Sequence, residues 1–146
     1  MKHSFVVETT SAGTPQEVFA IVADGAGWSR WAGPLVPRSR WECEGDPAPG
    51  GVGAVRRLGL GPLASREQVT AYEPGRLLAY RLLNGGPVRD YRATVELSEA
   101  PGGGTVVRWT GGFDRAVPGT AALGRWALGR VVHGLAHRLA AAAEGR

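Results

Sequence analysis

The sequence has few cysteines, few histidines and no long apolar run. Cys43 is the single cysteine among 146 residues, which excludes an intrachain disulfide and a multi-cysteine zinc cage. Glu42 and Glu44 flank this cysteine, and their negative charges disfavour a reactive thiolate. The opening segment MKHSFVVETT holds no long apolar stretch, and no other stretch reaches membrane-spanning length. We therefore expect a cytoplasmic protein with no membrane insertion.

The charge of the chain is close to balanced. Seventeen basic and thirteen acidic side chains give a net charge of +4. The excess lies in residues 115–146, which hold five arginines and one acidic residue, Glu144. Phosphate binding needs a denser basic patch than this, so we expect no nucleic-acid partner. Apolar residues make up 43% of the sequence, which is enough for one folded domain over residues 1–146.

The motifs that would indicate a metal or a cofactor are incomplete. His133 and His137 have the spacing of a helical metal site, but no acidic residue or cysteine accompanies them. A solvated helix face is the preferred interpretation of this pair. Gly51-Val52-Gly53 lacks the third glycine of a dinucleotide fingerprint because Arg56 stands in its place, so we interpret it as a turn. We expect no metal and no cofactor.

The first part of the sequence predicts a strand and two short helical segments. The strand covers residues 2–9. Thr14-Pro15-Gln16-Glu17 combines an N-cap, a proline at the first helical position and a glutamate at the third. The helix that it starts is expected to end at Asp24-Gly25. Trp28 and Trp31 are three residues apart, which fits a further helical turn with both indoles on one side.

The middle of the sequence predicts an antiparallel sheet, and its end predicts a long amphipathic helix. Short segments of β-forming residues are separated by glycine and proline turns, and apolar and polar side chains alternate along the later ones. The predicted strands are residues 38–45, 52–60, 65–73, 76–84, 88–98 and 104–114. After Pro118-Gly119, an apolar stripe recurs at helical spacing and is expected to pack on the inner face of the sheet. The stripe consists of Leu128, Val132, Leu135 and Leu139.

This order of elements, together with several motifs, resembles a known superfamily. The motifs are the run GVGAVRRLGLGPLASREQVTAYEPGRLLAYRLLNGGPVRDYRATVEL and, after it, GGTVVRWTGGFD. They are similar to the START-like (SRPBCC) superfamily, particularly its bacterial polyketide cyclase/dehydratase-like branch. The resemblance implies an α+β helix-grip fold. In that fold a curved antiparallel sheet of about seven strands wraps around the C-terminal helix, and two short helices follow the first strand. It also implies a hydrophobic cavity between sheet and helix.

The resemblance and the strand parity together suggest which residues bind a ligand. Aromatic side chains dominate the set, with Trp28 and Trp31 expected at the entrance, and they would suit a flat or ring-containing molecule. Ordinary core packing is the alternative for each of them. The expected ligand-binding residues are Trp28, Trp31, Arg56, Leu58, Leu60, Leu63, Glu67, Val69, Tyr80, Tyr91, Ala93, Trp109, Phe113, Leu128 and Val132.

Two charged residues are expected to face inward. Arg56 shares a strand face with Ala54 and Leu58, Glu67 shares one with Val69, and a hairpin between the two strands would set the charges nearly opposite. Burying either charge alone is expensive, so we expect a pair that anchors the polar end of the cavity.

The abscisic acid receptors of plants are similar over this stretch. The resemblance aligns an arginine, a gate loop and a pocket glutamate with Arg56, Gly59–Ser65 and Glu67. Those receptors have a second pocket glutamate where Trp109 stands here, which implies a more apolar cavity.

Three functions remain open. The first is binding of a small hydrophobic, cyclic or aromatic molecule, polyketide-like or lipid-like. The second is a polyketide cyclase or dehydratase reaction, in which Glu67 would be the acid-base group and Arg56 or Tyr91 would stabilise an enolate. The third is a protein-interaction module that uses the gate loop and the surface around Trp126. A homodimer also stays open.

Overall fold

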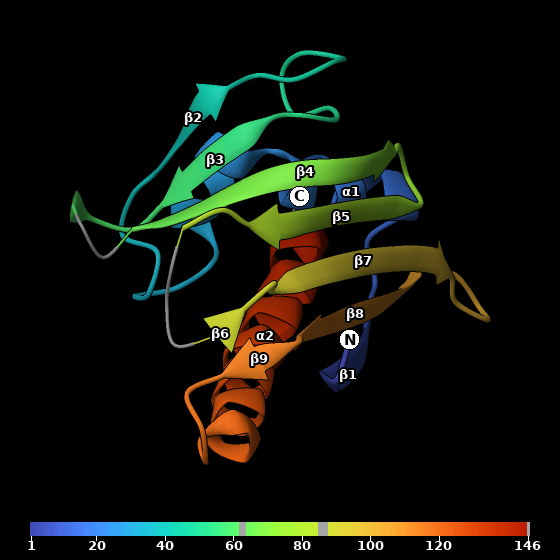
Figure 1. The fold of residues 1–146 in the computed structure, drawn as a ribbon. Coiled ribbons are helices and arrows are strands. Elements are labelled where there is room, and N and C mark those ends of the chain that lie inside the picture. Colours follow the sequence, from blue (N-terminus) through green and yellow to red (C-terminus); the bar gives the residue numbers. More distant parts are fainter. Residues whose placement is uncertain (62–63, 85–87, 146) are drawn as a thin grey trace.

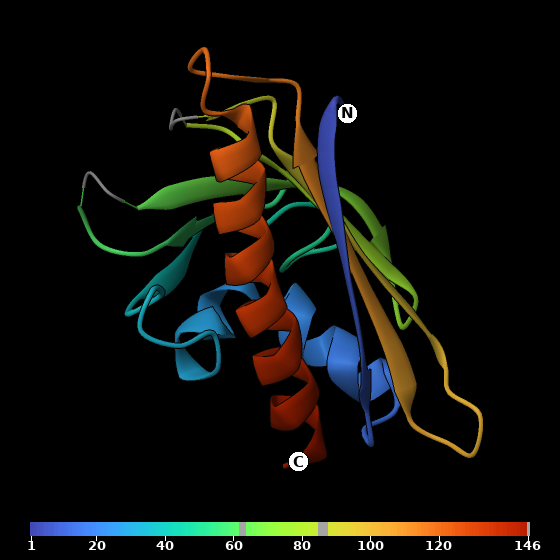
Figure 2. The same cartoon turned by 90° about the horizontal axis from the view of Figure 1, so that it is seen from below.

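One antiparallel sheet wraps around a long C-terminal helix (Figures 1 and 2). The computed structural model describes residues 1–61, 64–84 and 88–145. The expected α+β helix-grip fold is confirmed. In chain order the elements are β1 (His3–Ser11), α1 (Pro15–Ala23), the 3-10 helix η1 (Gly25–Arg30), β2 (Ser39–Cys43), β3 (Val55–Leu58), β4 (Ser65–Glu73), β5 (Leu77–Leu82), β6 (Val88–Arg89), β7 (Arg92–Glu99), β8 (Thr105–Phe113), β9 (Arg115–Ala116) and α2 (Ala121–Glu144).

The seven strands of the main sheet follow the order β1-β8-β7-β5-β4-β3-β2, and β6 pairs with β9 in a separate ribbon. Several strands are shorter than predicted, and for two of them the backbone gives the reason. The segment 88–98 is divided into β6 and β7, because Asp90 adopts a φ of 61° that extended strands do not have. The segment 52–60 is reduced to β3, which stops at Leu58 because Gly59 has a φ of 108°.

The start of α1 follows directly from its sequence. The Glu17 amide donates to the Thr14 hydroxyl at 3.1 Å, and the Thr14 amide donates to the Glu17 carboxylate at 3.0 Å. This reciprocal pair is a capping box, and Pro15 occupies the first helical position. The helix buries Val18 and Val22 completely. As a result, α1 is fixed against the inner side of the sheet.

The C-terminal half of α2 is tied to the beginning of the chain. The Ser11 hydroxyl donates to the carbonyl of Ala140 at 2.8 Å, and the Ala12 amide donates to the Glu144 carboxylate at 2.9 Å. A Cβ atom built on Gly13 would lie 2.8 Å from the Cβ of Ala143, so only glycine permits this approach. Figure 2 shows α1 beside the same half of α2. This half of the helix is therefore closely packed.

The predicted apolar stripe of α2 divides into two parts. Val132 and Leu139 are fully buried, whereas Leu128 and Leu135 are half-buried and only border the core. The expectation that the whole stripe packs on the sheet is thus correct for Val132 and Leu139 but not for the other two residues. Within the described part of the chain, no helix is long and apolar enough to cross a membrane.

Candidate ligand-binding site

A cavity of about 670 Å³ lies where the N-terminal half of α2 stands away from the sheet. Its walls come from α2, from β4 and β5, and from the segment between η1 and β2. Ligand pockets commonly have about 300–1,000 Å³ and an apolar lining with a few polar groups. The polar groups here include the Glu67 carboxylate and the hydroxyls of Tyr80 and Tyr91. The cavity therefore has the size and character of a small-molecule site.

About half of the expected ligand-binding residues border this cavity. They come from η1, β3, β4, β5, the junction of β6 and β7, and α2, which the fold brings together. They are Trp28, Leu58, Glu67, Tyr80, Tyr91, Leu128 and Val132.

Six other expected residues lie outside the cavity wall. Trp109 packs edge-on against Trp28 with ring centroids 5.9 Å apart, and its indole N–H donates to the Tyr80 hydroxyl at 3.3 Å. The ring centroids of Trp31 and Trp28 lie 4.8 Å apart. Trp28 is buried and Trp31 is half-buried, so neither of these two indoles stands at an entrance as expected. The residues placed behind the wall are Trp31, Arg56, Val69, Ala93, Trp109 and Phe113.

The expected gate loop is only partly described. Leu60 was expected to face inward, but it is 51% exposed and borders an outer groove beside Arg38 and Arg57. The reason is that β3 ends at Leu58, so the alternation of faces does not continue to Leu60. Leu63 lies outside the described residues.

Several cavity residues are missing from the predicted set. Leu35 and Val36 lie in a segment between prolines that has no periodicity. Ala127 and Val131 lie on α2, next to the predicted apolar stripe and not in it. A row of apolar residues four apart, from Leu123 to Val131, is the signal that could have revealed the α2 pair.

Arg56 and Glu67 form the polar centre of the site. They occupy directly opposite positions in the β3–β4 hairpin, and the Arg56 Nη2 atom donates to the Glu67 Oε1 atom at 3.1 Å. The predicted inward pair is confirmed. The Arg56 side chain is fully buried and that of Glu67 is 11% exposed. Among the described residues, Oε2 of Glu67 has no hydrogen-bond partner, and Glu67 borders the cavity.

Arg56 is held between two aromatic rings. Its guanidinium carbon lies 4.2 Å from the centroid of the Trp28 ring and 4.5 Å from that of Tyr80. A second nitrogen, Nη1, donates to the carbonyl of Val22 at 3.3 Å. Gly25 makes room for this arrangement, because a Cβ atom there would lie 2.9 Å from the Cδ atom of Arg56. The positive charge is thus covered by rings and can act on a ligand only through Glu67.

Burial raises the pKa of the Glu67 carboxyl, and the nearby Arg56 charge and hydrogen bond oppose that rise. Removal from water disfavours the charged carboxylate, and a nearby positive charge favours it. Burial also raises the pKa of the Tyr80 and Tyr91 phenols, and the charge of Glu67 adds to the rise in both. Both phenols are therefore neutral hydrogen-bond donors at neutral pH.

The described residues contain no group of three or more metal-ligating side chains. His133 and His137 are exposed, as expected, with their Nε2 atoms 3.1 Å apart. His137 also lies 3.4 Å from the Thr9 hydroxyl. Neither histidine borders the cavity, and neither does Thr9.

Known structures share this arrangement of elements. A START superfamily protein from Mycobacterium smegmatis superposes with a TM-score of 0.81 over 98% of both chains, at 13% identity. The protein XoxI from Bacillus cereus superposes with a TM-score of 0.77 over 96% of this chain and 94% of its own, at 19% identity. At such low identity the likeness establishes the fold alone.

Sequence relatives and a family model extend the comparison. Uncharacterized proteins of Mycobacterium tuberculosis and Mycobacterium bovis are 29% identical over 117 residues, which cover 75% of this chain and 65% of theirs. The family described as polyketide cyclase / dehydrase and lipid transport matches residues 2–144. Family and fold together indicate a hydrophobic ligand-binding domain of the START-like type. The chain belongs to the polyketide cyclase / dehydrase and lipid transport family.

Proposed function

We propose that the domain binds a small, mainly apolar, ring-containing molecule that donates one hydrogen bond to Glu67. The observation that carries this proposal is the carboxylate of Glu67, the single one that the described residues place in the wall of a cavity of about 670 Å³. A ligand that fills such a cavity loses most of its contact with water, so an apolar body stabilises the complex.

The ring preference rests on the aromatic side chains of the wall. Trp28, Tyr80 and Tyr91 all border the cavity. Aromatic rings prefer stacked or edge-to-face contacts with other rings, which contribute about 0.5–1.5 kcal/mol beyond their buried area. A planar or cyclic ligand therefore gains more from this wall than a flexible chain of equal size.

The polar part of the ligand follows from the charges around Glu67. Oε1 is engaged by Arg56, and the pair carries no net charge while both groups are ionised. The free Oε2 atom can accept a hydrogen bond, and the neutral phenol of Tyr91 can donate one. A hydroxyl group on the ligand can satisfy both, since it donates and accepts.

A variant that fills the cavity tests the proposal. Val131 borders the cavity and is 38% exposed, so Val131→Trp narrows the cavity without disturbing the buried core. Val6→Trp is the matched control, because Val6 lies on β1, is 50% exposed and does not border the cavity.

The uncharged apolar dye N-phenyl-1-naphthylamine reports on cavity binding by its fluorescence. The Val6 variant should bind the dye like the wild type, and the Val131 variant should lose most of its binding. Native mass spectrometry of protein purified from its own host should reveal a bound molecule that the Val131 variant lacks. Equal dye binding by both variants would contradict the proposal.

A second candidate function is acid-base catalysis, favoured by the burial that raises the pKa of Glu67. Catalytic carboxyl groups are commonly adjusted in this way. Glu67 would remove a proton from a carbon next to a carbonyl group, and Tyr91 would donate a hydrogen bond to the resulting enolate. Arg56 would act only by holding Glu67, because it does not border the cavity.

Glu67→Gln separates the two functions. In a binding protein, glutamine still accepts a hydrogen bond through its amide oxygen, so part of the affinity should remain. In an enzyme, binding should persist while the rate falls by about 10²–10⁴-fold. Isothermal titration with the molecule identified by mass spectrometry gives the affinity, and product analysis of the same mixture gives the rate.

A further inference from the structure

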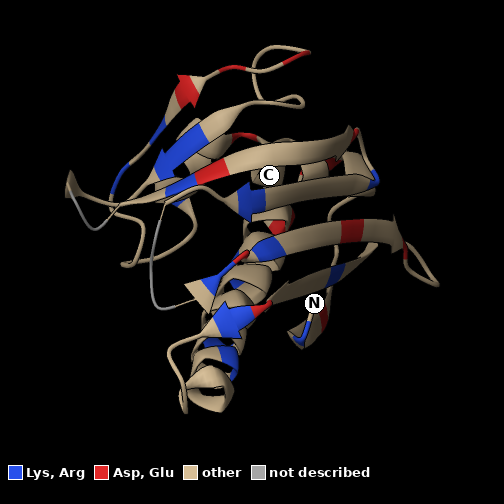
Figure 3. Ribbon diagram, in the orientation of Figure 1, with Lys and Arg blue, Asp and Glu red and all other residues tan. Residues whose placement is uncertain are grey.

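The sheet carries a row of arginines that lie directly opposite one another. Arg40 of β2 is opposite Arg57 of β3, and Arg57 is opposite Arg66 of β4. Directly opposite side chains in an antiparallel sheet are neighbours, and like charges there destabilise the pairing. Figure 3 shows basic residues at the same end of β3, β4, β5 and β7. An anion placed between such arginines offsets their repulsion.

Glu42 supplies this anion for one of the two arginine pairs. Its Oε1 atom lies 3.0 Å from Nη2 of Arg66, and its Oε2 atom lies 3.6 Å from Nη1 of Arg57. The hydrogen bond from Arg66 lowers the pKa of the Glu42 carboxyl, so Glu42 is ionised at neutral pH. The side chain of Arg40, by contrast, forms no ion pair or hydrogen bond with the described residues. The pair of Arg40 and Arg57 therefore lacks the bridging anion that its neighbour has.

An outer groove of about 480 Å³ lies at this uncompensated pair. Arg38, Arg40 and Arg57 border it, and no described acidic residue does. Arg38 is exposed and, like Arg40, forms no ion pair with the described residues. We call this space the arginine groove. It gathers three positive charges around a volume that holds no negative charge from the described chain.

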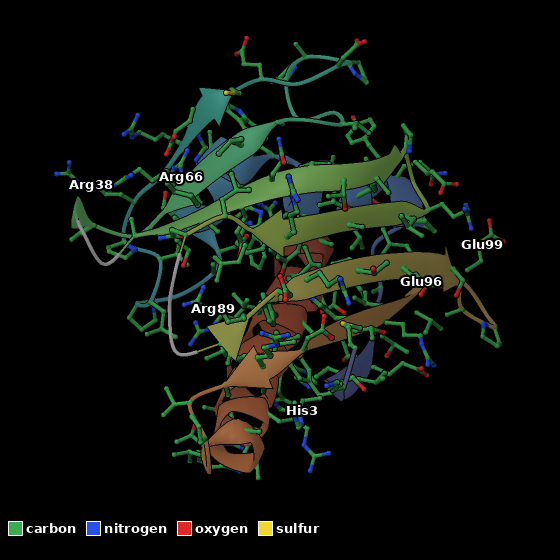
Figure 4. The ribbon with its side chains drawn as sticks, in the orientation of Figure 1. His3, Arg38, Arg66, Arg89, Glu96 and Glu99 are labelled. Atoms are coloured by element: carbon green, nitrogen blue, oxygen red, sulfur yellow. The ribbon has the colours of Figure 1, made fainter. Side chains whose placement is uncertain are left out.

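The arginine groove is separate from the cavity. No described residue borders both spaces, although Leu58 borders the cavity while its chain neighbours Arg57 and Gly59 border the groove. The acidic residues labelled in Figure 4, Glu96 and Glu99, lie at the opposite end of the sheet from Arg38. The groove is thus a second candidate site, on the other side of the wall from the first.

We propose that the arginine groove binds a phosphorylated small molecule through its phosphate or diphosphate group. A phosphate monoester carries about −1.5 to −2 charges at pH 7, which suits three arginines better than a single carboxylate does. Guanidinium groups match phosphate oxygens in a bidentate geometry. The Ser29 hydroxyl also borders the groove and forms no hydrogen bond with the described residues, so it can donate one to the anion. This inference goes beyond the proposed function, since it concerns a different site.

The lining of the arginine groove favours a small molecule over a nucleic acid. Proteins that bind single strands stack the bases on aromatic side chains, and no described aromatic residue borders the groove. Binding of duplex DNA relies on contacts to many phosphates along an extended basic surface. The groove instead has a volume typical of small-molecule pockets.

Isothermal titration calorimetry with pyrophosphate tests the proposal, with sodium chloride of the same ionic strength as the reference. Arg38→Gln/Arg40→Gln should weaken pyrophosphate binding by about 10-fold to 100-fold, because each arginine contributes charge-assisted hydrogen bonds. The control Arg125→Gln/Arg130→Gln removes the same charge from α2, where both arginines are exposed and neither borders the groove. It should bind pyrophosphate like the wild type.

Ser29→Ala distinguishes a formed site from a general positive field. The variant loses one hydrogen-bond donor and keeps every charge, so pyrophosphate binding should weaken by about 3-fold to 10-fold. Unchanged binding would show that charge alone attracts the anion and would overturn the proposal.

Thermal unfolding of Arg40→Gln gives an independent measurement. Without pyrophosphate, the variant no longer repels Arg57 and should unfold at a higher temperature than the wild type. With pyrophosphate, the unfolding temperature of the wild type should rise far more than that of the variant, because a ligand stabilises only the folded state that binds it.

Three further results would overturn the proposal: no heat of pyrophosphate binding beyond the salt reference, equal losses in the two double variants, or a short duplex DNA that binds the groove more tightly than pyrophosphate. Because none of these assays needs a ligand in the cavity, their failure would leave the proposed binding function standing.

Discussion

Replacing Arg56 with methionine removes the positive charge of the buried pair and leaves the Glu67 carboxyl without its partner. Breaking a fully buried pair by removing one member costs about 3–5 kcal/mol. Glu67 is 11% exposed and borders the cavity, so water that reaches it reduces this cost. The methionine still fills the space between Trp28 and Tyr80. We therefore expect a loss of about 3 kcal/mol in the free energy of unfolding at about pH 8.

The same variant should lose less stability in mild acid. Burial raises the pKa of Glu67 and Arg56 opposes that rise, so the folded-state pKa should increase further when Arg56 is absent. The ordinary value is 4.5. Between this value and the raised one, the folded variant holds a proton that the unfolded chain has released. Its stability therefore falls as the pH rises through this window, and the loss caused by Arg56→Met should be smaller at about pH 5 than at pH 8.

Urea unfolding followed by tryptophan fluorescence at the two pH values gives the required free energies. Arg108→Met is the control, because Arg108 is 51% exposed and pairs with Glu8 on the surface. Such exposed pairs contribute about 0–1 kcal/mol. If Arg56→Met costs no more than Arg108→Met, or costs the same at both pH values, the argument that Arg56 stabilises a buried carboxylate is refuted.

Two further predictions concern the core and the buried phenols. Leu139→Ala removes a fully buried side chain of α2 and should cost about 2–5 kcal/mol in urea unfolding, while Leu123→Ala at the exposed start of the helix should cost far less. In an alkaline absorbance titration, the phenols of Tyr80 and Tyr91 should ionise late, because burial raises their pKa above the usual 10.0. These two phenols should ionise only as the protein unfolds. Keeping them protonated stabilises the folded state below pH 10.0, and this stability is lost as the pH rises above that value.

Local patterns in the sequence predicted the parts of the fold that depend on neighbouring residues. The Thr14–Glu17 capping box and the opposition of Arg56 and Glu67 across a hairpin are both local, and both are present. The parity argument was wrong at Leu60, because it assumed a strand that continues past Gly59.

The cavity wall was harder to predict than the strands. The sequence predicted a place in the cavity wall for both Trp28 and Trp109. Trp28 borders the cavity, whereas Trp109 lies in the core behind it. That difference depends on how far α2 stands from the sheet, a distance that no local pattern encodes. Leu35 contributes from an irregular segment, where no period identifies the inward side chains.

The hydrogen bonds that join Ser11 and Ala12 to the end of α2 have a kinetic consequence. They connect residues more than a hundred positions apart, so forming them requires closure of nearly the whole chain, whereas the β3–β4 hairpin closes a short loop. We expect the consecutive hairpins of the sheet to form first, and the pairing of β1 with the distant β8 and the docking of α2 to come last. A molecule held between the sheet and α2 gains its contacts only after that final step. It should therefore slow the unfolding of the domain while leaving the rate of folding almost unchanged.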